Sequence, residues 1–122
     1  MSEEECAELG AAIADLCKSA ADGEPKILIL ASSDLSHYLS PKETEKLDRM
    51  ALEQVLALDA PGLLRVVENE NISMCGVLPT AVMLFAAATL GAKRARLLKH
   101  CHSGDVSPMR KVVGYASVAM EI

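Results

Sequence analysis

The chain of 122 residues lacks several features that would assign it quickly. It has no tryptophan, one phenylalanine and two tyrosines, so its core has to be built from aliphatic side chains and methionine. Acidic residues outnumber basic ones by 17 to 12, and the net charge of -5 leaves no basic surplus to neutralise phosphates. We therefore expect no nucleic-acid partner.

Further absences concern the cellular location. The N-terminus is acidic and lacks the basic-then-apolar layout of a signal peptide. The longest charge-free run, residues 71–92, is interrupted by polar residues and a proline, and so falls short of the roughly 20 apolar residues of a membrane span. The four cysteines form no Cys-x-x-Cys pair, which favours free thiols over a disulfide framework. The sequence thus predicts a cytoplasmic protein without membrane contact.

The residues that are present predict a single domain over residues 1–122, with 51% apolar and 24% charged residues. Capping residues and apolar spacings of three and four positions indicate helices. The predicted helices are a first from Ser2 to a turn at residues 22–25, a second that begins at Ser40 and Pro41, a third from about Asp59 to Glu68, and a fourth over residues 80–90 that is apolar all round and therefore fully buried. The second helix should bury a stripe of Leu47, Met50, Ala51, Val55 and Leu58.

Strands are expected at residues 26–31, 94–102 and 111–120. The first contains four consecutive apolar residues, Ile27 to Leu30, a run typical of a strand buried on both faces. The order of one helix, one strand, three helices and two strands predicts a layered α/β sheet with helices packed on it. Because three strands make a thin sheet for four helices, we expect a second copy or a larger sheet.

A polar loop follows the first predicted strand. It contains Ser32, Ser33, Asp34, Ser36 and His37, at the carboxyl end of the strand, where open α/β sheets bind ligands. Asp34 and His37 could serve as metal ligands or as an acid–base pair. The alternative is loop capping, in which such side chains only satisfy backbone donors.

Two other groups of residues have chemical potential. Cys75 is followed by a glycine and precedes a helix, so its thiolate could lie at a helix N-terminus and suit metal or redox work; the alternative is a small buried hydrophobe. His100 and His102 share one strand face while Cys101 lies on the other, so the three cannot share one metal without distortion. We interpret these histidines as structural or solvent-facing.

Four motifs in this order resemble those of the Memo family, also called AmmeMemoRadiSam system protein B. They are residues 32–38, 74–79, 103–105 and 112–116. The resemblance runs along nearly the whole chain, and it implies half of a Memo-like fold similar to that of the class III extradiol dioxygenases (LigB-like). Family members are much longer, and this chain resembles their C-terminal half.

The resemblance also implies a pocket. Its residues would be Asp34 and His37 in catalytic roles, His37 and Cys75 as metal ligands, and Ser32, Ser33 and Asp105 as ligand-binding residues. The implied metal is iron or copper, which a mixture of imidazole and thiolate suits better than it suits magnesium or calcium. The implied chemistry is oxidation or oxygen-dependent redox.

The family's two further pocket histidines belong to the N-terminal half, so the pocket is incomplete in this chain. Two alternatives to a redox protein remain: an adaptor that binds peptides or proteins in the same pocket, and an inactive structural fragment. The expected partner is the missing N-terminal half, or another copy of the chain, held through an exposed sheet edge and apolar helices.

Overall fold

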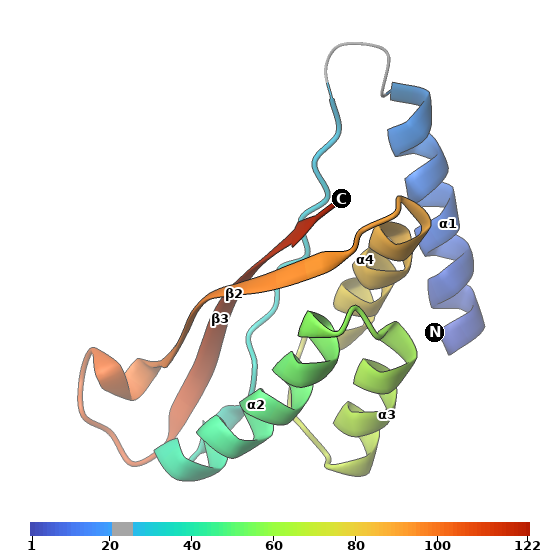
Figure 1. The fold of residues 1–122 in the computed structure, drawn as a ribbon. Coiled ribbons are helices and arrows are strands. Elements are labelled where there is room, and N and C mark those ends of the chain that lie inside the picture. The colour runs from blue at the N-terminus through green and yellow to red at the C-terminus, as the bar shows by residue number, and fades with distance from the viewer. Residues whose placement is uncertain (21–25) are drawn as a thin grey trace.

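The computed structural model describes residues 1–20 and 26–122, so the turn predicted at residues 22–25 lies outside the described residues. The elements, in chain order, are α1 (Glu3–Ala20), β1 (His37–Leu39), α2 (Pro41–Leu56), α3 (Ala60–Asn69), α4 (Val77–Thr89), β2 (Arg94–His102), the short 3-10 helix η1 (Ser103–Asp105) and β3 (Val112–Glu121) (Figure 1). None of the helices in the described ranges combines the length and hydrophobicity that crossing a membrane requires.

Helices begin where the capping residues predict. At α1, Ser2 and Glu5 exchange two hydrogen bonds, each side chain accepting from the other residue's backbone N–H. At α2, the Ser40 hydroxyl accepts from the backbone N–H three residues on, at 3.2 Å. At α3, Asp59 does the same at 2.8 Å. Each bond satisfies a donor that a helix start leaves free, which is why these local signals are reliable.

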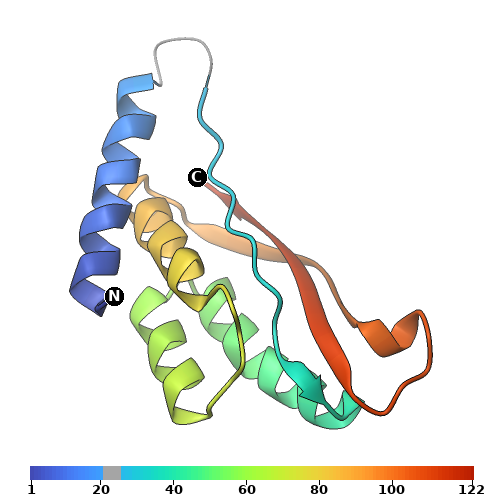
Figure 2. The same ribbon diagram turned by 180° about the vertical axis from the view of Figure 1, so that it is seen from behind.

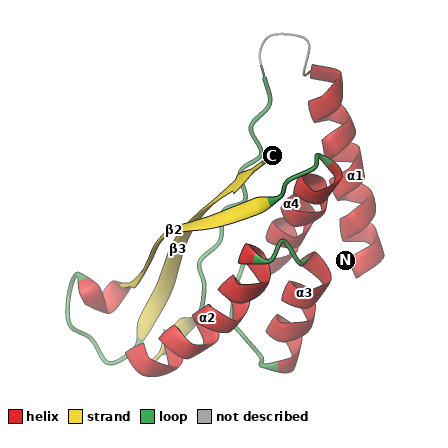
Figure 3. Ribbon diagram, viewed as in Figure 1, coloured by secondary structure: helices red, strands yellow, loops and turns green. Residues whose placement is uncertain are grey.

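The sheet has three antiparallel strands in the order β1-β3-β2 (Figure 3). β2 begins and ends at the predicted residues, and β3 runs one residue later than predicted at each end. The two form a long hairpin that carries η1 at its tip (Figure 1). β1 is a short addition to the other edge of β3 and was not predicted.

Packing proceeds from the sheet outward through the helices. α2 lies against β2 and β3, α3 packs on α2, α4 on α3, and α1 on α4. Alternate residues of β3, namely Ala116, Val118 and Met120, contact the apolar cluster that these helices share. The predicted α/β architecture, helices packed on a small sheet, is therefore confirmed.

The predicted strand at residues 26–31 is wrong. These residues form no strand, and the side chains of Ile27, Leu28 and Leu30 are 50%, 88% and 84% exposed. Within the described part of the chain, residues 26–34 make no backbone-to-backbone hydrogen bond; the first is donated by Leu35 N–H to the Gly114 carbonyl. An apolar run specifies a strand only where neighbouring strands can pair with it, and here it leads into β1 as an unpaired stretch (Figure 2).

Two helix predictions need correction. α4 begins at Val77, three residues before the predicted start, and it is not buried all round: Met83 and Ala87 are half-buried and line an open cavity. On α2, Ala51 and Val55 are buried as predicted, whereas Leu47 and Met50 are only partly buried, and the predicted stripe member Leu58 lies beyond the end of α2 and is also partly buried. The fully buried face of α2 instead comprises Thr44, Asp48, Ala51, Leu52 and Val55.

Candidate metal centre

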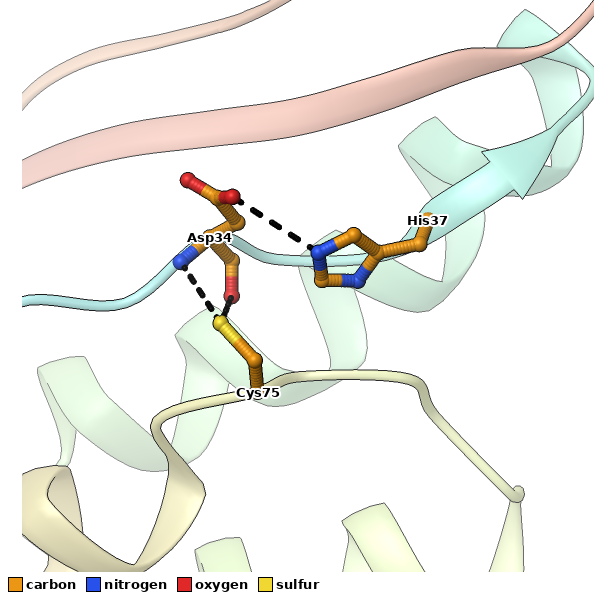
Figure 4. Close-up of side chains that lie close together, drawn as sticks. All are labelled: Asp34, His37 and Cys75. Carbon is orange, nitrogen blue, oxygen red and sulfur yellow. Dashed lines mark hydrogen bonds and ion pairs between the residues drawn. The ribbon is translucent and has the colours of Figure 1, made fainter.

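Three side chains that could hold a metal ion converge at one place. One ligand atom each from Asp34, His37 and Cys75 lies within 4.8 Å of the others. Asp34 and His37 come from the stretch that enters β1, and Cys75 comes from the loop before α4 (Figure 4). The sequence separates Cys75 from Asp34 by 41 positions, so tertiary structure alone brings the thiol to this pair.

Ser33 and Gly76 hold the two segments together. The Ser33 hydroxyl accepts the Gly76 backbone N–H at 2.8 Å and donates to the Asp34 carbonyl at 2.7 Å. Gly76 is required for close approach, because a Cβ there would lie 2.5 Å from the Ser33 Cβ and 2.7 Å from the Ser32 carbonyl oxygen. The glycine after the cysteine therefore lets the Cys75 loop touch the polar stretch.

Cys75 is exposed, which excludes the interpretation as a small buried hydrophobe. Its Sγ accepts the Asp34 backbone N–H at 3.4 Å, and the Ser33 hydroxyl lies 3.8 Å away. The N-cap of α4, Gly76, follows directly. The sulfur therefore lies beside an N–H donor and the N-terminus of α4, and it also lies 3.9 Å from the Asp34 carbonyl oxygen.

His37 is fixed by Ser73. Its backbone N–H donates to the Ser73 hydroxyl at 2.8 Å, and its ring Nδ1 is hydrogen-bonded to the Ser73 carbonyl. A carbonyl only accepts, so Nδ1 carries a hydrogen, and in the neutral ring the lone pair is then on Nε2. In metal sites, a histidine commonly binds the metal through one ring nitrogen and donates the N–H of the other to a carbonyl in the same way.

The free lone pair of His37 faces a carboxylate. Nε2 lies 3.6 Å from Asp34 Oδ2 (Figure 4), and neither atom has a hydrogen to offer the other while the ring is neutral. Two acceptors at this separation attract each other only through a proton or a cation placed between them. The Asp34 side chain is 49% exposed and that of His37 22% exposed, so a cation from solvent can reach both.

Asp34 does not cap the loop. Its carboxylate lies 3.6 Å from the His37 ring, and the backbone N–H groups of Asp34 and His37 donate instead to the Cys75 sulfur and the Ser73 hydroxyl. The electrostatic pattern of the site is therefore a cluster of acceptors, held in place by neutral hydroxyls and backbone groups. Side chains of these three types could hold a metal ion.

Two residues predicted to bind a ligand lie outside this cluster of side chains. Ser32 is exposed and contributes its carbonyl to the contact with Gly76. Asp105, in η1, accepts the His102 backbone N–H at 2.9 Å and pairs with the ring of that histidine at 3.5 Å. Among the described contacts none joins Asp105 to the candidate site. The ligand-binding roles of Ser32, Ser33 and Asp105 stay predictions.

Sequence reasoning also missed residues. Asp48 on α2 is completely buried and contacts His100, which is thus held by a structural contact. The apolar residues at positions 51, 52 and 55 indicate that Asp48 lies on the inner face of α2, because they follow it by three, four and seven. Tyr38 has a φ of 58°, in the left-handed region, and no pattern in the sequence indicated that.

Comparison with known proteins identifies the family of this chain. The family pattern described as Memo-like protein matches residues 1–119. The chain belongs to the Memo family. A protein of Methanopyrus kandleri, named as a MEMO1 family protein, is 41% identical over 112 residues, which is 91% of this chain and 38% of that protein. The resemblance seen in the four motifs is thereby confirmed.

Other MEMO1 family proteins match over similar lengths. Those of Methanosarcina barkeri and Methanocaldococcus jannaschii are 39% and 40% identical over 98% and 97% of this chain, and the matches cover 44% and 40% of the relatives. The chain thus spans about two-fifths of the length of these curated relatives.

Proposed function

We propose that this Memo-family chain supplies part of a redox metal site, in which His37 and Cys75 bind iron or copper and Asp34 acts beside them. The observation that carries the proposal is the cluster of Asp34, His37 and Cys75, each of which has one potential ligand atom within 4.8 Å of the others. A neutral imidazole and a carboxylate oriented lone pair to lone pair are stabilised by a cation between them.

The donor set fits the proposed metals. Imidazole together with thiolate selects iron, copper or zinc, and does not suit magnesium or calcium. A bound iron or copper would supply one-electron redox chemistry. The residues of this chain would hold that metal and orient it, and the Asp34 carboxylate, being half-exposed, would accept or return a proton at Oδ2.

Two metal ligands on the surface, with Asp34 beside them, leave coordination positions open. In the relatives, more than half of the chain lies outside the matched region. We propose that this additional polypeptide completes the pocket and covers the apolar stretch, defined here as residues 26–31. A polypeptide that packed on the stretch would arrive beside Asp34, three residues further along.

The cavities beside the apolar stretch support the proposal that another polypeptide covers it. It lines two open cavities of about 420 and 370 Å³, one toward α1, α4 and the end of β3, the other toward α1 and α4. Both are walled mainly by apolar side chains such as Met83, Leu90 and Val82. An unpaired backbone with exposed apolar side chains offers a strand-pairing edge to another polypeptide segment.

Metal titration of the purified chain tests the metal proposal. Calorimetry or elemental analysis measures the binding. We expect the wild type to bind Cu²⁺ or Fe²⁺, and we expect weaker binding in His37→Ala, Cys75→Ser and Asp34→Asn. Cys101→Ser is the matched control, because that half-buried cysteine lies on β2 outside the cluster. Equal binding by the control and by the three site variants would contradict the site, and binding of Zn²⁺ alone would contradict the redox assignment.

A further inference from the structure

A buried carboxylate lies behind the candidate metal centre. Asp48, on α2, is 0% exposed, which is rare for an aspartate unless each oxygen has a partner. Its Oδ1 accepts the Ser36 backbone N–H at 2.9 Å, and its Oδ2 accepts from His100 Nε2 at 3.0 Å. The carboxylate therefore joins α2, β2 and the segment that enters β1.

Gly114 on β3 makes room for this carboxylate. A Cβ at Gly114 would lie 1.9 Å from Asp48 Oδ2, so the oxygen sits against the bare backbone of the strand. The same glycine exchanges two backbone hydrogen bonds, both of 2.9 Å, with Leu35 N–H and the Ser36 carbonyl. Asp48 and Gly114 together restrain the backbone of residues 35 and 36 through three hydrogen bonds.

The restrained residues separate Asp34 from His37. Leu35 and Ser36 are both buried, whereas the two side chains that flank them point to the exposed cluster. A shift of this dipeptide would move Asp34 Oδ2 and His37 Nε2 relative to each other, and it would disturb the hydrogen bond that the Asp34 backbone N–H donates to the Cys75 sulfur. Buried polar contacts that are fully paired fix one geometry, because any other leaves a donor or acceptor without a partner.

We propose that Asp48 is a positioning residue for the candidate metal centre. It sets the backbone of Leu35 and Ser36, and through it the orientation of Asp34 and His37 toward Cys75. The metal part of this proposal rests on the proposed function; the geometric part does not. A purely structural Asp48 would lower stability without changing the site in the molecules that remain folded.

Four variants separate the two roles. Asp48→Ala removes both hydrogen bonds. Asp48→Asn keeps an oxygen for the Ser36 N–H and offers an amide to His100, whose Nε2 can become an acceptor. His100→Ala removes one bond at a half-buried position. Leu63→Ala, in the core on α3 and away from the cluster, controls for lost stability because its side chain is equally buried.

Two measurements on the metal-free chain report the geometry. Nitrogen–proton correlation spectra of the His37 ring show which nitrogen carries the hydrogen, and peptide mass spectrometry gives the alkylation rate of Cys75 relative to Cys101 in the same molecule. We expect Asp48→Ala to mix the His37 tautomers and change the relative rate. Asp48→Asn and Leu63→Ala should resemble the wild type in both.

Co²⁺ serves as the metal probe, since its thiolate absorption band reports ligation by Cys75. Asp48→Ala should raise the dissociation constant about 10- to 100-fold, as loss of a supporting contact behind a ligand does, with Asp48→Asn close to wild type. If Asp48→Ala does not fold, His100→Ala should show a smaller change in the same direction.

The outcomes distinguish the two proposals. A wild type that binds no Co²⁺ refutes the metal proposal, while the His37 spectra and Cys75 rates still decide the positioning role. Unchanged spectra, rates and affinity in Asp48→Ala and His100→Ala overturn the positioning role. An equal effect of Leu63→Ala, measured on folded protein, overturns it as well.

Discussion

Replacing Leu28 and Leu30 together by serine probes what the apolar stretch does. The two side chains are 88% and 84% exposed in the isolated chain, so their loss removes little packing there. Surface substitutions of this kind change the free energy of unfolding by about 0.5 kcal/mol or less each. We therefore expect Leu28→Ser/Leu30→Ser to unfold at nearly the same urea concentration as the wild type.

The same substitutions should strongly weaken association. Burying a leucine side chain contributes about 1.5–3 kcal/mol, and most of each side chain is still available to be covered. The pair would then contribute about 2.5–5 kcal/mol when another polypeptide covers it, which corresponds to roughly two to four orders of magnitude in the dissociation constant. The effect on binding exceeds the effect on folding because the contact exists only in the complex.

The assay uses the unmatched part of the Methanosarcina barkeri relative as a separate polypeptide, with calorimetry for the dissociation constant and light scattering for the mass of each species. Leu98→Ser/Val106→Ser is the control, since both side chains are exposed and line neither of the two cavities. Equal affinity of the wild type and Leu28→Ser/Leu30→Ser would refute the reasoning. So would a stable homodimer of the wild type that buries residues 26–31, because a second copy would then be the occupant.

Three smaller predictions concern stability. Tyr38→Gly should raise the free energy of unfolding by up to about 1 kcal/mol, because it relieves a left-handed φ of 58° at a residue that is 70% exposed; a clear loss in urea denaturation would show that the ring is packed. Thr44→Val should stabilise by about 1 kcal/mol, since the buried Thr44 hydroxyl has no hydrogen-bond partner among the described residues, and unchanged or lower stability would contradict this. Glu121 accepts hydrogen bonds from Arg94, and this guanidinium holds the pKa of the carboxyl below its usual value. The resulting small stabilisation is present at neutral pH and is lost as the pH falls from the ordinary glutamate pKa through the lowered one; Glu121→Gln should flatten that acidic part of the melting-temperature profile.

Local signals predicted the helices well and the first strand badly, for one physical reason. A helix satisfies its own backbone hydrogen bonds, so a cap such as Ser40 and a spacing of apolar residues within one segment determine where it starts. A strand needs partners from elsewhere in the fold. Residues 26–31 have the composition of a central strand, but no neighbouring strand pairs with them within the described part of the chain.

The candidate site divides in a similar way. Asp34 and His37 are predictable from the sequence because they are three residues apart and follow an apolar run. The geometry of this pair is not predictable from the sequence. It depends on Ser73, whose carbonyl binds the His37 ring, and on Asp48, which is buried although most aspartates are exposed. The family resemblance brought Cys75 to the pocket; composition and periodicity left it open between a ligand and a buried hydrophobe.

The contact between Ser33 and Gly76 explains why a motif can be specific without all of its residues touching a ligand. The Ser33 hydroxyl has its hydrogen committed to the Asp34 carbonyl and one lone pair committed to the Gly76 N–H, so a single lone pair is left for any ligand. Gly76 contributes only the absence of a side chain. Both residues are needed to bring the Cys75 sulfur to Asp34, because a longer side chain at either position would separate the two segments. At the candidate site, the side chains that could hold a metal ion and the groups that bring them together are therefore different residues of the same short motifs.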